Sequence, residues 1–427
     1  MTTTTTFTTE RRRLTVLRAA RLFDGTGSTL LADPMVVLDG TTILAVDHAT
    51  TAPPGAEVVD LPDATLLPGL IDTHLHLAFD ASTDPVGHLA GRDDNQALAA
   101  MAEAARTALR GGVTTVRDLG DRDYLSLTLR RSPPADGPLP TIVAAGPPIT
   151  TPGGHCHYLG GATRGVEGIR AAVREHAERG VDVIKIMASG GHLTPGTRPD
   201  LPQFGLAELR AAVAEAHRHS LPITAHAHST HAIADAVAAG VDGIEHATFQ
   251  TADDVHAPED LIRAIAARRT VIGMTAGVAP VPGASPPPEL ARRLPAILTN
   301  LGRLYQAGAP VVAGTDAGIA PVKPHDVLRW ALPQLTGIGL TPTDALRAIT
   351  SKAAAVCGLD HRKGRLAPGY DADILAVQGN PLADLGALPR IQAVYARGTR
   401  ICDEATAGSD GDPGFTGLRP SRRAPVR

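Results

Sequence analysis

The 427-residue sequence predicts an α/β protein: a (β/α)8 TIM barrel with a small β-sandwich domain built from the N- and C-terminal segments. Two observations predict this fold. Eight short apolar runs alternate with alanine-rich stretches through residues 66–363, and β-like runs separated by turn residues occupy 14–65 and 364–405. Strands that alternate with helices favour a parallel sheet, and eight such repeats are typical of a closed barrel. Residues 1–13 and 406–427 are expected to be disordered tails.

The apolar runs supply the predicted strands. They are "TLLPGLIDTHLHL", "VTTVRDLG", "PTIVAAG", "VDVIKIMASGG", "LPITAHAH", "GIEHATF", "TVIGMT" and "PVVAGTDAG". The stretches between them, such as "NQALAAMAEAARTALRGG", have helical composition, and many end in glycine, which commonly follows a helix. In "LTPTDALRAIT" we expect Thr341 to cap a helix whose first residue is Pro342.

Composition excludes several classes of protein. The chain has 40 basic and 44 acidic side chains and only 3% aromatic residues, so nothing indicates binding to nucleic acid or to an anionic membrane. No apolar run approaches the roughly 18 residues that span a bilayer, and no apolar segment follows the N-terminal arginines as in a signal peptide. The three cysteines, Cys156, Cys357 and Cys402, are too sparse for a disulfide framework and fit a reducing compartment. We therefore expect a cytoplasmic protein.

Residues of metal-ligand type lie late in several of the apolar runs. His74 and His76 are two apart in the first run, and residues two apart on a strand point to the same face. The full set, in chain order, is His74, His76, Lys185, His226, His228, His246 and Asp316. In a (β/α)8 barrel the catalytic groups lie at the C-terminal ends of the strands. Neutral imidazole and carboxylate suit zinc and similar divalent ions, so this pattern indicates a metal site.

Each of these residues, taken alone, has a simpler interpretation. A buried histidine is more often a hydrogen-bonded core residue than a ligand, and Asp316 alone could cap a turn or the next helix. A lysine inside an apolar strand, such as Lys185, is harder to explain, because burying an unpaired ammonium group is costly. The coincidence of so many ligand-type residues at predicted strand ends favours a metal site over a series of independent accidents.

With these residues the chain resembles the amidohydrolase superfamily, which has H-x-H on the first barrel strand, lysine on the fourth, histidines on the fifth and sixth, and aspartate on the eighth. The matching segments, "PGLIDTHLH", "IKIMASGG", "AHAHS", "IEHAT" and "GTDAG", look like its imidazolonepropionase-like and prolidase-like branch. The C-terminal "GRLAPGYDADILAVQGNPL" is similar to the family segment that completes the sandwich. The resemblance covers roughly residues 14 to 405.

The resemblance implies a binuclear metal centre. His74 and His76 would bind the more buried ion, and His226 and His246 would bind the second. Zinc is the default metal, and manganese, iron or cobalt would fit similar ligands.

By the same resemblance, Lys185 and Asp316 would complete the centre. Lys185 would be carboxylated and its carbamate would bridge the ions; this needs a neutral amine, and burial and nearby cations both lower a lysine pKa. Asp316 would bind the first ion and contact a bridging hydroxide, which two ions can generate near neutral pH. As the catalytic residue, Asp316 would take the proton of the hydroxide and deliver it to the departing amine nitrogen.

The loops after the strands provide candidate substrate contacts. The loop at 149–161 contains a GGH motif like that of the branch, which implies that His155 contacts substrate; a solvated, flexible loop is the alternative. His228 shares a face with His226 and would lie nearer the substrate, although a solvated or supporting role has equal weight. Some dipeptidases of the branch have tyrosine at the position of His228, where it contacts the substrate carboxylate. The histidine in this chain therefore weakens the case for a carboxypeptidase-like specificity.

Three neighbouring residues receive simpler predictions. In the loop at 189–204, His192 and Arg198 could meet a substrate carboxylate, although a solvent-exposed arginine is the stronger default. Glu245 adjoins His246, and strand alternation predicts that its side chain points outward in a structural role.

The leading functional hypothesis is a metal-dependent, peptidase-like hydrolase that cleaves a C–N amide bond of a small molecule, with a dipeptide or N-acyl amino acid as first choice. The alternatives are hydrolysis of a cyclic amide, as in imidazolonepropionase, or of a carbamate. A mononuclear deaminase usually has glutamate three residues after the fifth-strand histidine, where this chain has Ser229. A non-catalytic scaffold would have lost ligands that are all present here. The expected partner is the substrate alone, without nucleic acid or membrane, and a homo-oligomer would fit the family.

Overall fold

The parallel strands are the part of the fold that positions the candidate site. The computed structural model describes residues 14–48 and 51–401, so Cys402 and the tails predicted at 1–13 and 406–427 lie outside the described residues. All eight predicted apolar runs contain β-strands, arranged in two parallel sheets. The three-stranded sheet contains β6 (Leu70–Leu75), β7 (Val113–Asp118) and β8 (Thr141–Ala144). The five-stranded sheet contains β9 (Ile184–Met187), β10 (Ile223–Ser229), β11 (Gly243–Gln250), β12 (Val271–Thr275) and β13 (Val311–Gly314).

Isolated parallel bridges lie where the two sheets adjoin. One bridge pairs Leu75, at the end of β6, with Ala317, just after β13. Another pairs Ile149, after β8, with Ile186 on β9. The predicted α/β class is confirmed, whereas the closed barrel stays a prediction, because the regular ladders form two sheets.

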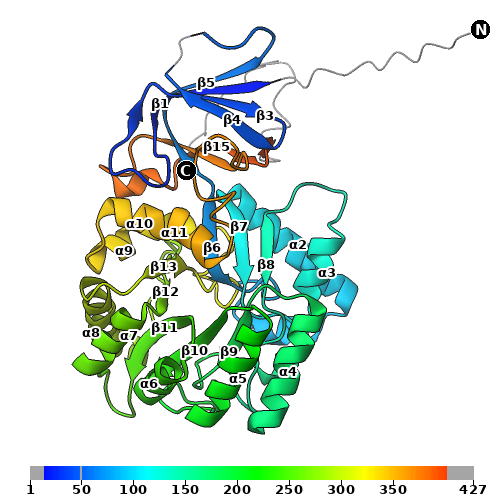
Figure 1. Cartoon of the computed structure of the whole chain (residues 1–427), viewed down its shortest axis with the longest axis vertical. Helices are drawn as coiled ribbons and strands as arrows, with labels where there is room; N and C mark the ends of the chain where they lie inside the picture. The colour runs from blue at the N-terminus through cyan, green and yellow to red at the C-terminus, as the bar shows by residue number, and fades with distance from the viewer. Residues whose placement is uncertain (1–13, 49–50, 402–427) are drawn as a thin grey trace, which may run out of the picture.

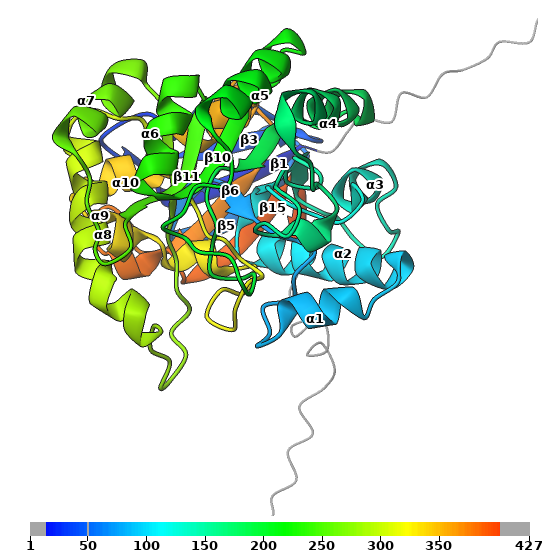
Figure 2. The ribbon, with the colours of Figure 1, turned by 90° about the horizontal axis from the view of Figure 1, so that it is seen from below.

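Helices lie around the outside of these strands, as Figure 2 shows from below. Their bounds are α1 (Pro85–Ala90), α2 (Asp94–Arg110), α3 (Leu125–Arg131), α4 (Gly165–Arg179), α5 (Leu206–Arg218), α6 (Thr230–Ala239), α7 (Glu259–Arg268), α8 (Pro288–Gln306), α9 (Leu332–Gly337), α10 (Pro342–Ala348) and α11 (Ser351–Val356). Short 3₁₀ helices are η1 (His157–Leu159), η2 (Val327–Trp330) and η3 (Leu385–Ala387). Apolar side chains of strands and helices pack into one extensive buried core.

Capping residues explain where several helices begin and end. Asp93 accepts from the Gln96 amide at the start of α2. At α10, Thr341 accepts from Asp344 N and Pro342 is the first helical residue, which confirms the prediction made from the sequence. Helix α4 ends at Gly180, whose φ of 85° suits a residue without Cβ.

A third sheet combines strands from the N-terminal and C-terminal segments of the described chain (Figure 1). It has eight strands in the order β16-β15-β14-β5-β1-β3-β4, with β2 on β1. Their bounds are β1 (Thr15–Leu22), β2 (Leu31–Ala32), β3 (Met35–Asp39), β4 (Thr42–Asp47), β5 (Glu57–Pro68), β14 (Ile374–Gln378), β15 (Ile391–Ala396) and β16 (Thr399–Ile401). Antiparallel pairing of β14 with β5 links the C-terminal segment to the N-terminal one. This sheet has its own apolar cluster, which includes Leu17, Leu66 and Ile374.

Strand burial decides which side chains can reach the site. Every residue of β6 and of β10 is buried, so these strands carry their histidines into the interior rather than to the surface. No helix among the described residues has both the length and the apolar character to cross a membrane.

Candidate metal centre

Two clusters of metal-ligand type meet at the C-terminal ends of the parallel strands. Within each cluster the candidate ligand atoms all lie within 4.8 Å of one another. The clusters are His74, His76 and Asp316, and His226, His228 and His246. They adjoin, because the ring centroids of His74 and His246 are 5.0 Å apart. The structure thus brings together five histidines and one aspartate from the ends of four strands, β6, β10, β11 and β13.

The carboxylate of Asp316 completes the first cluster. Its Oδ1 lies 3.2 Å from His76 Nε2 and 3.6 Å from His74 Nε2. The amides of Thr315 and Asp316 donate to His74 O at 3.0 and 2.7 Å, which fixes the turn after β13 against β6. Burial acts to raise the pKa of Asp316, but the imidazoles of His74 and His76 outweigh it and hold the pKa below its ordinary value. The carboxylate is therefore ionised at neutral pH.

Both imidazoles of the first cluster are oriented by acceptors on their outer side. His74 Nδ1 lies 3.0 Å from Glu245 Oε2, and His76 Nδ1 lies 3.1 Å from Gly120 O. Carboxylate and carbonyl oxygens only accept, so we assign a hydrogen to each Nδ1, which leaves each Nε2 to face Asp316. In the metal-free chain a proton on His76 Nε2 stabilises the carboxylate, and in the metal-bound chain a divalent ion would take the place of that proton. The donor set therefore fits a divalent ion.

The second cluster consists of two stacked imidazoles and a third, His226, whose ring is nearly perpendicular to both. The rings of His228 and His246 are stacked at 4.6 Å, and His226 lies 4.7 Å from His246. Burial lowers the pKa of all three well below the ordinary histidine value, and neighbouring imidazoles lower it further. They are therefore neutral, which is the form that binds metals. His226 Nε2 lies 3.1 Å from Gly190 O, which leaves its Nδ1 as the free lone pair.

Lys185 reaches the first cluster from a neighbouring strand. It lies on β9, beside the β10 strand that carries His226 and His228, and its Nζ is 3.5 Å from His74 Nε2. The side chain is 1% exposed, and burial lowers its pKa to about 8. A lysine in this setting is far more often neutral than a solvated one.

His155 enters the same region from the loop at 149–161. Its ring lies 4.7 Å from that of His226, and its backbone amide donates to Gln203 Oε1 at 2.5 Å. Burial lowers its pKa to about 4, and its Nδ1 has no hydrogen-bond partner among the described residues. A buried, unpaired polar atom beside the second cluster is available to a substrate.

His228, His192 and Arg198 differ in how they relate to the site. His228 Nδ1 lies 2.8 Å from Thr248 Oγ1, and its ring centroid lies 5.4 Å from that of His192. The side chain of Arg198 is 57% exposed and pairs with Asp200. Arg198 is therefore a solvent-exposed arginine, as the sequence favoured, rather than a residue that faces the two clusters.

Glu245 does not point outward as strand alternation predicted. It is buried and contacts His74 across the strands, while its neighbour His246 belongs to the second cluster. The reason is local backbone geometry: His246 and Ala247 have φ of 69° and 49°, so the chain leaves the extended conformation where alternation holds. Burial acts to raise the pKa of Glu245, but Arg117 and His74 outweigh it and keep the group ionised.

Sequence reasoning also missed Arg117, which lies on β7 and forms an ion pair with Glu245 at 2.9 Å. Charged residues inside the apolar runs "TVRD" and "GIEH" were the available signal, because buried charges require partners.

Asp80, which lies in the loop after β6, has a different role. It pairs with His88 and Arg92, both at 2.8 Å, and so fixes that loop to the start of the helical layer.

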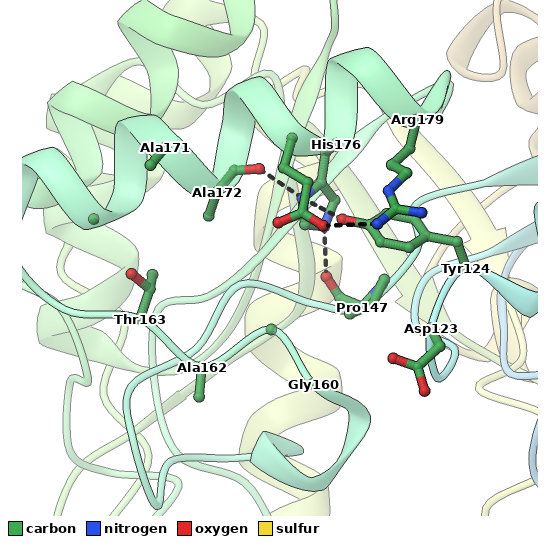
Figure 3. A pocket seen from close by; sticks show the side chains of 13 residues that line it. Asp123, Tyr124, Pro147, Gly160, Ala162, Thr163, Ala171, Ala172, His176 and Arg179 are labelled. Atoms are coloured by element: carbon green, nitrogen blue, oxygen red, sulfur yellow. Dashed lines mark hydrogen bonds and ion pairs between the residues drawn. The ribbon is translucent and has the colours of Figure 1, made fainter.

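A separate cavity of about 430 Å³ lies against α4, between this helix and the residues that follow the His155 loop (Figure 3). Tyr124, His176 and Arg179 line it, and both ring nitrogens of His176 lie 2.7 Å from backbone carbonyls. The predicted site residues of the described chain do not line it. The candidate centre is therefore distinct from this cavity.

Comparison with known proteins agrees with this arrangement of ligand residues. A family model described as "Amidohydrolase family" matches residues 65–401. The chain belongs to the amidohydrolase family. This confirms the resemblance inferred from the motifs, and it makes the chain an amidohydrolase-type hydrolase.

Named relatives of this amidohydrolase include several hydrolases. Ochratoxinase from Aspergillus niger is 27% identical over 430 residues, covering 90% of this chain and 85% of that protein. Imidazolonepropionase from Deinococcus deserti is 28% identical over 407 residues, covering 86% and 91%. A crystal structure of a Xaa-Pro dipeptidase with methionine bound in its active site is similar with a TM-score of 0.79 and 25% identity, covering 91% of this chain and 99% of that one.

Proposed function

We propose that the chain is a binuclear metal-dependent hydrolase that cleaves a C–N amide bond of a small molecule, a dipeptide or an N-acyl amino acid. The observation that carries the proposal is the meeting of the two ligand clusters beside the buried Lys185. The Xaa-Pro dipeptidase among the similar structures supports a peptide-like substrate. The imidazolonepropionase relative favours a cyclic amide as the second candidate.

Six residues would hold the metal ions. The ligands we propose are His74, His76, Lys185 as its carbamate, His226, His246 and Asp316. Zinc is the default ion, and manganese, iron or cobalt would suit the same donors. When bound, the pair of ions would supply Lewis-acid polarisation of the amide carbonyl and a nucleophilic water. The neutral state that burial favours for Lys185 supports carboxylation of its amine.

The remaining chemistry belongs to side chains of the chain itself. The ionised Asp316 carboxylate accepts the proton of the attacking water and returns it to the departing amine nitrogen, because an amide anion is a poor leaving group. His155, with its unpaired Nδ1, and His228 would bind and orient the substrate over the two clusters.

We also propose the closed form of the fold. The bridges Leu75–Ala317 and Ile149–Ile186 support closure of the two parallel sheets into a (β/α)8 barrel over residues 66–363. The segments 14–65 and 364–405 would form the accompanying β-sandwich domain, and a homo-oligomer fits the family.

Metal analysis and substrate screening test the proposal together. Elemental analysis of the purified protein should give close to two divalent ions per chain, with Lys185 carboxylated. A panel of dipeptides, N-acyl amino acids, lactams and carbamates should show turnover in the first two groups. One ion per chain with an unmodified lysine contradicts the binuclear mechanism, and turnover confined to lactams selects the cyclic-amide alternative.

A further inference from the structure

We infer that Glu245 is a positioning residue of the metal centre, which fixes the ring of His74 so that its Nε2 is presented to an ion. The inference rests on the proposed function, because it requires His74 to be a ligand. Glu245 Oε2 lies 3.0 Å from His74 Nδ1, although 171 positions separate the two residues in sequence. An acceptor on Nδ1 selects the tautomer in which Nε2 carries the lone pair.

The carboxylate of Glu245 is itself held from its other oxygen. Arg117 Nη2 donates to Oε1 at 2.9 Å, and Thr224 Oγ1 donates to the same oxygen at 2.7 Å. Arg117 also donates from Nε to Thr73 O, at 2.6 Å, next to His74 in the chain. Side chains from β7 and β10 thus hold the β11 carboxylate that contacts His74 of β6.

The packing around this network is built to admit a carboxylate. The side chains of Glu245 and Arg117 are only 1% and 5% exposed, so each ion depends on the other for compensation. On the neighbouring strand β12 stands Gly273, where a Cβ atom would lie 2.1 Å from Glu245 Oε2. Any other residue at this position would displace the carboxylate from His74. The glycine at position 273 of β12 therefore leaves the space that the Glu245 carboxylate occupies beside His74.

This arrangement has a consequence for metal affinity. A carboxylate that accepts from a ligating histidine orients the ring and raises the basicity of the other nitrogen. Loss of such a partner typically weakens metal binding by about 10–100-fold. In this chain the effect should fall on the ion bound by His74, because Glu245 contacts no other histidine of the two clusters among the described hydrogen bonds.

The substitution Glu245→Gln tests the inference with little change in shape. If its amide group faces His74, it can only donate there and so favours the wrong tautomer; if it faces Arg117, two donors meet. Glu215→Gln is the matched control, because Glu215 is also a buried carboxylate paired with arginines, on α5 and outside the two clusters. Zinc affinity is measured by competition with a chromophoric chelator, and unfolding of the metal-free proteins is followed alongside.

The expected result is a 10–100-fold loss of affinity for one of the two zinc ions in Glu245→Gln, with both affinities kept in Glu215→Gln. Should Glu245→Gln fail to fold, Thr224→Val removes one of the hydrogen bonds to Glu245 and should give a smaller loss at the same ion. Unchanged zinc affinity in a folded Glu245→Gln overturns the inference and leaves the proposed function intact. Failure of the unsubstituted protein to bind zinc or another divalent ion overturns both.

Discussion

The Oδ1 atom of Asp316 lies 3.2 Å from Nε2 of His76, so residues that follow β13 and β6 share one cluster. The side chain of Asp316 is 16% exposed, against 2% for His74 and 7% for His76. Within the cluster the carboxylate is thus the group nearest to solvent and to an incoming substrate. This position, together with its ionised state, supports the proposed proton transfer by Asp316 rather than by an imidazole.

Replacing Asp316 by asparagine should abolish most turnover. The amide keeps the shape of the side chain but has neither the charge nor the basicity that proton transfer requires, so kcat should fall by about 10²–10⁴-fold. Steady-state kinetics on the best substrate of the panel, with circular dichroism to check the fold, measures this. Asp384→Asn is the control, because Asp384 lies between β14 and β15, outside the two clusters, and pairs with Arg390. Near-normal turnover in Asp316→Asn contradicts its assignment as the proton shuttle.

Lys185 should make the stability of the metal-free protein depend on pH. Its pKa is lowered to about 8 in the folded chain from 10.5, so between these values the unfolded chain binds more protons and folding becomes more favourable as pH rises. Below about pH 8 the buried amine is charged, and the cost of burying that charge reduces the free energy of unfolding by on the order of 3 kcal/mol. Lys185→Met, which keeps the apolar length without the amine, should lack this dependence.

Denaturant unfolding of both proteins between pH 7 and pH 10, in chelator and without bicarbonate, provides the measurement. The difference in free energy of unfolding between Lys185→Met and the unsubstituted protein should shrink as the pH rises. A difference that stays constant over this range would show that the buried amine is not what sets the stability.

The sequence was sufficient to predict the strands and the residues of metal-ligand type that cluster at their ends, because each signal was local. Apolar runs mark buried parallel strands, and the histidines, Lys185 and Asp316 are unusual residue types inside them. Capping residues such as Thr341 could also be predicted from the sequence, since a cap depends only on neighbours in the chain.

The partners across strands could not be predicted in the same way. The contact of Glu245 with His74 depends on the left-handed backbone at His246 and on the space above Gly273, and neither follows from alternation. Likewise, nothing in the loop sequence indicated that Asp80 pairs with His88 and Arg92. Such interactions depend on which strands and loops lie side by side, which a single sequence does not state.

His155 should affect substrate binding more than metal binding. Its ring lies against His226 and its Nδ1 has no partner among the described residues, so His155→Ala should lower kcat/KM by roughly tenfold, the value of about 1.4 kcal/mol for one lost hydrogen bond, and leave metal content unchanged. His157→Ala is the control in the same loop, because His157 is exposed and its Nδ1 contacts Gly154 O. Loss of metal in His155→Ala would instead make it a ligand.

Gly314 should be intolerant of a side chain because it packs against His74. A Cβ atom there would lie 2.4 Å from both the Cβ and the backbone nitrogen of His74, and neither atom can move without shifting β6. Gly314→Ala should therefore reduce the free energy of unfolding by about 1–3 kcal/mol, the usual cost of overpacking, and weaken metal binding as well.

Gly337→Ala, at the end of α9, is the control, since a Cβ atom there would meet nothing within 4 Å. It should leave stability unchanged or raise it by up to about 1 kcal/mol. Denaturant unfolding of the two variants side by side separates a local steric conflict from the general effect of replacing glycine, and equal effects at both positions would remove the role assigned to Gly314.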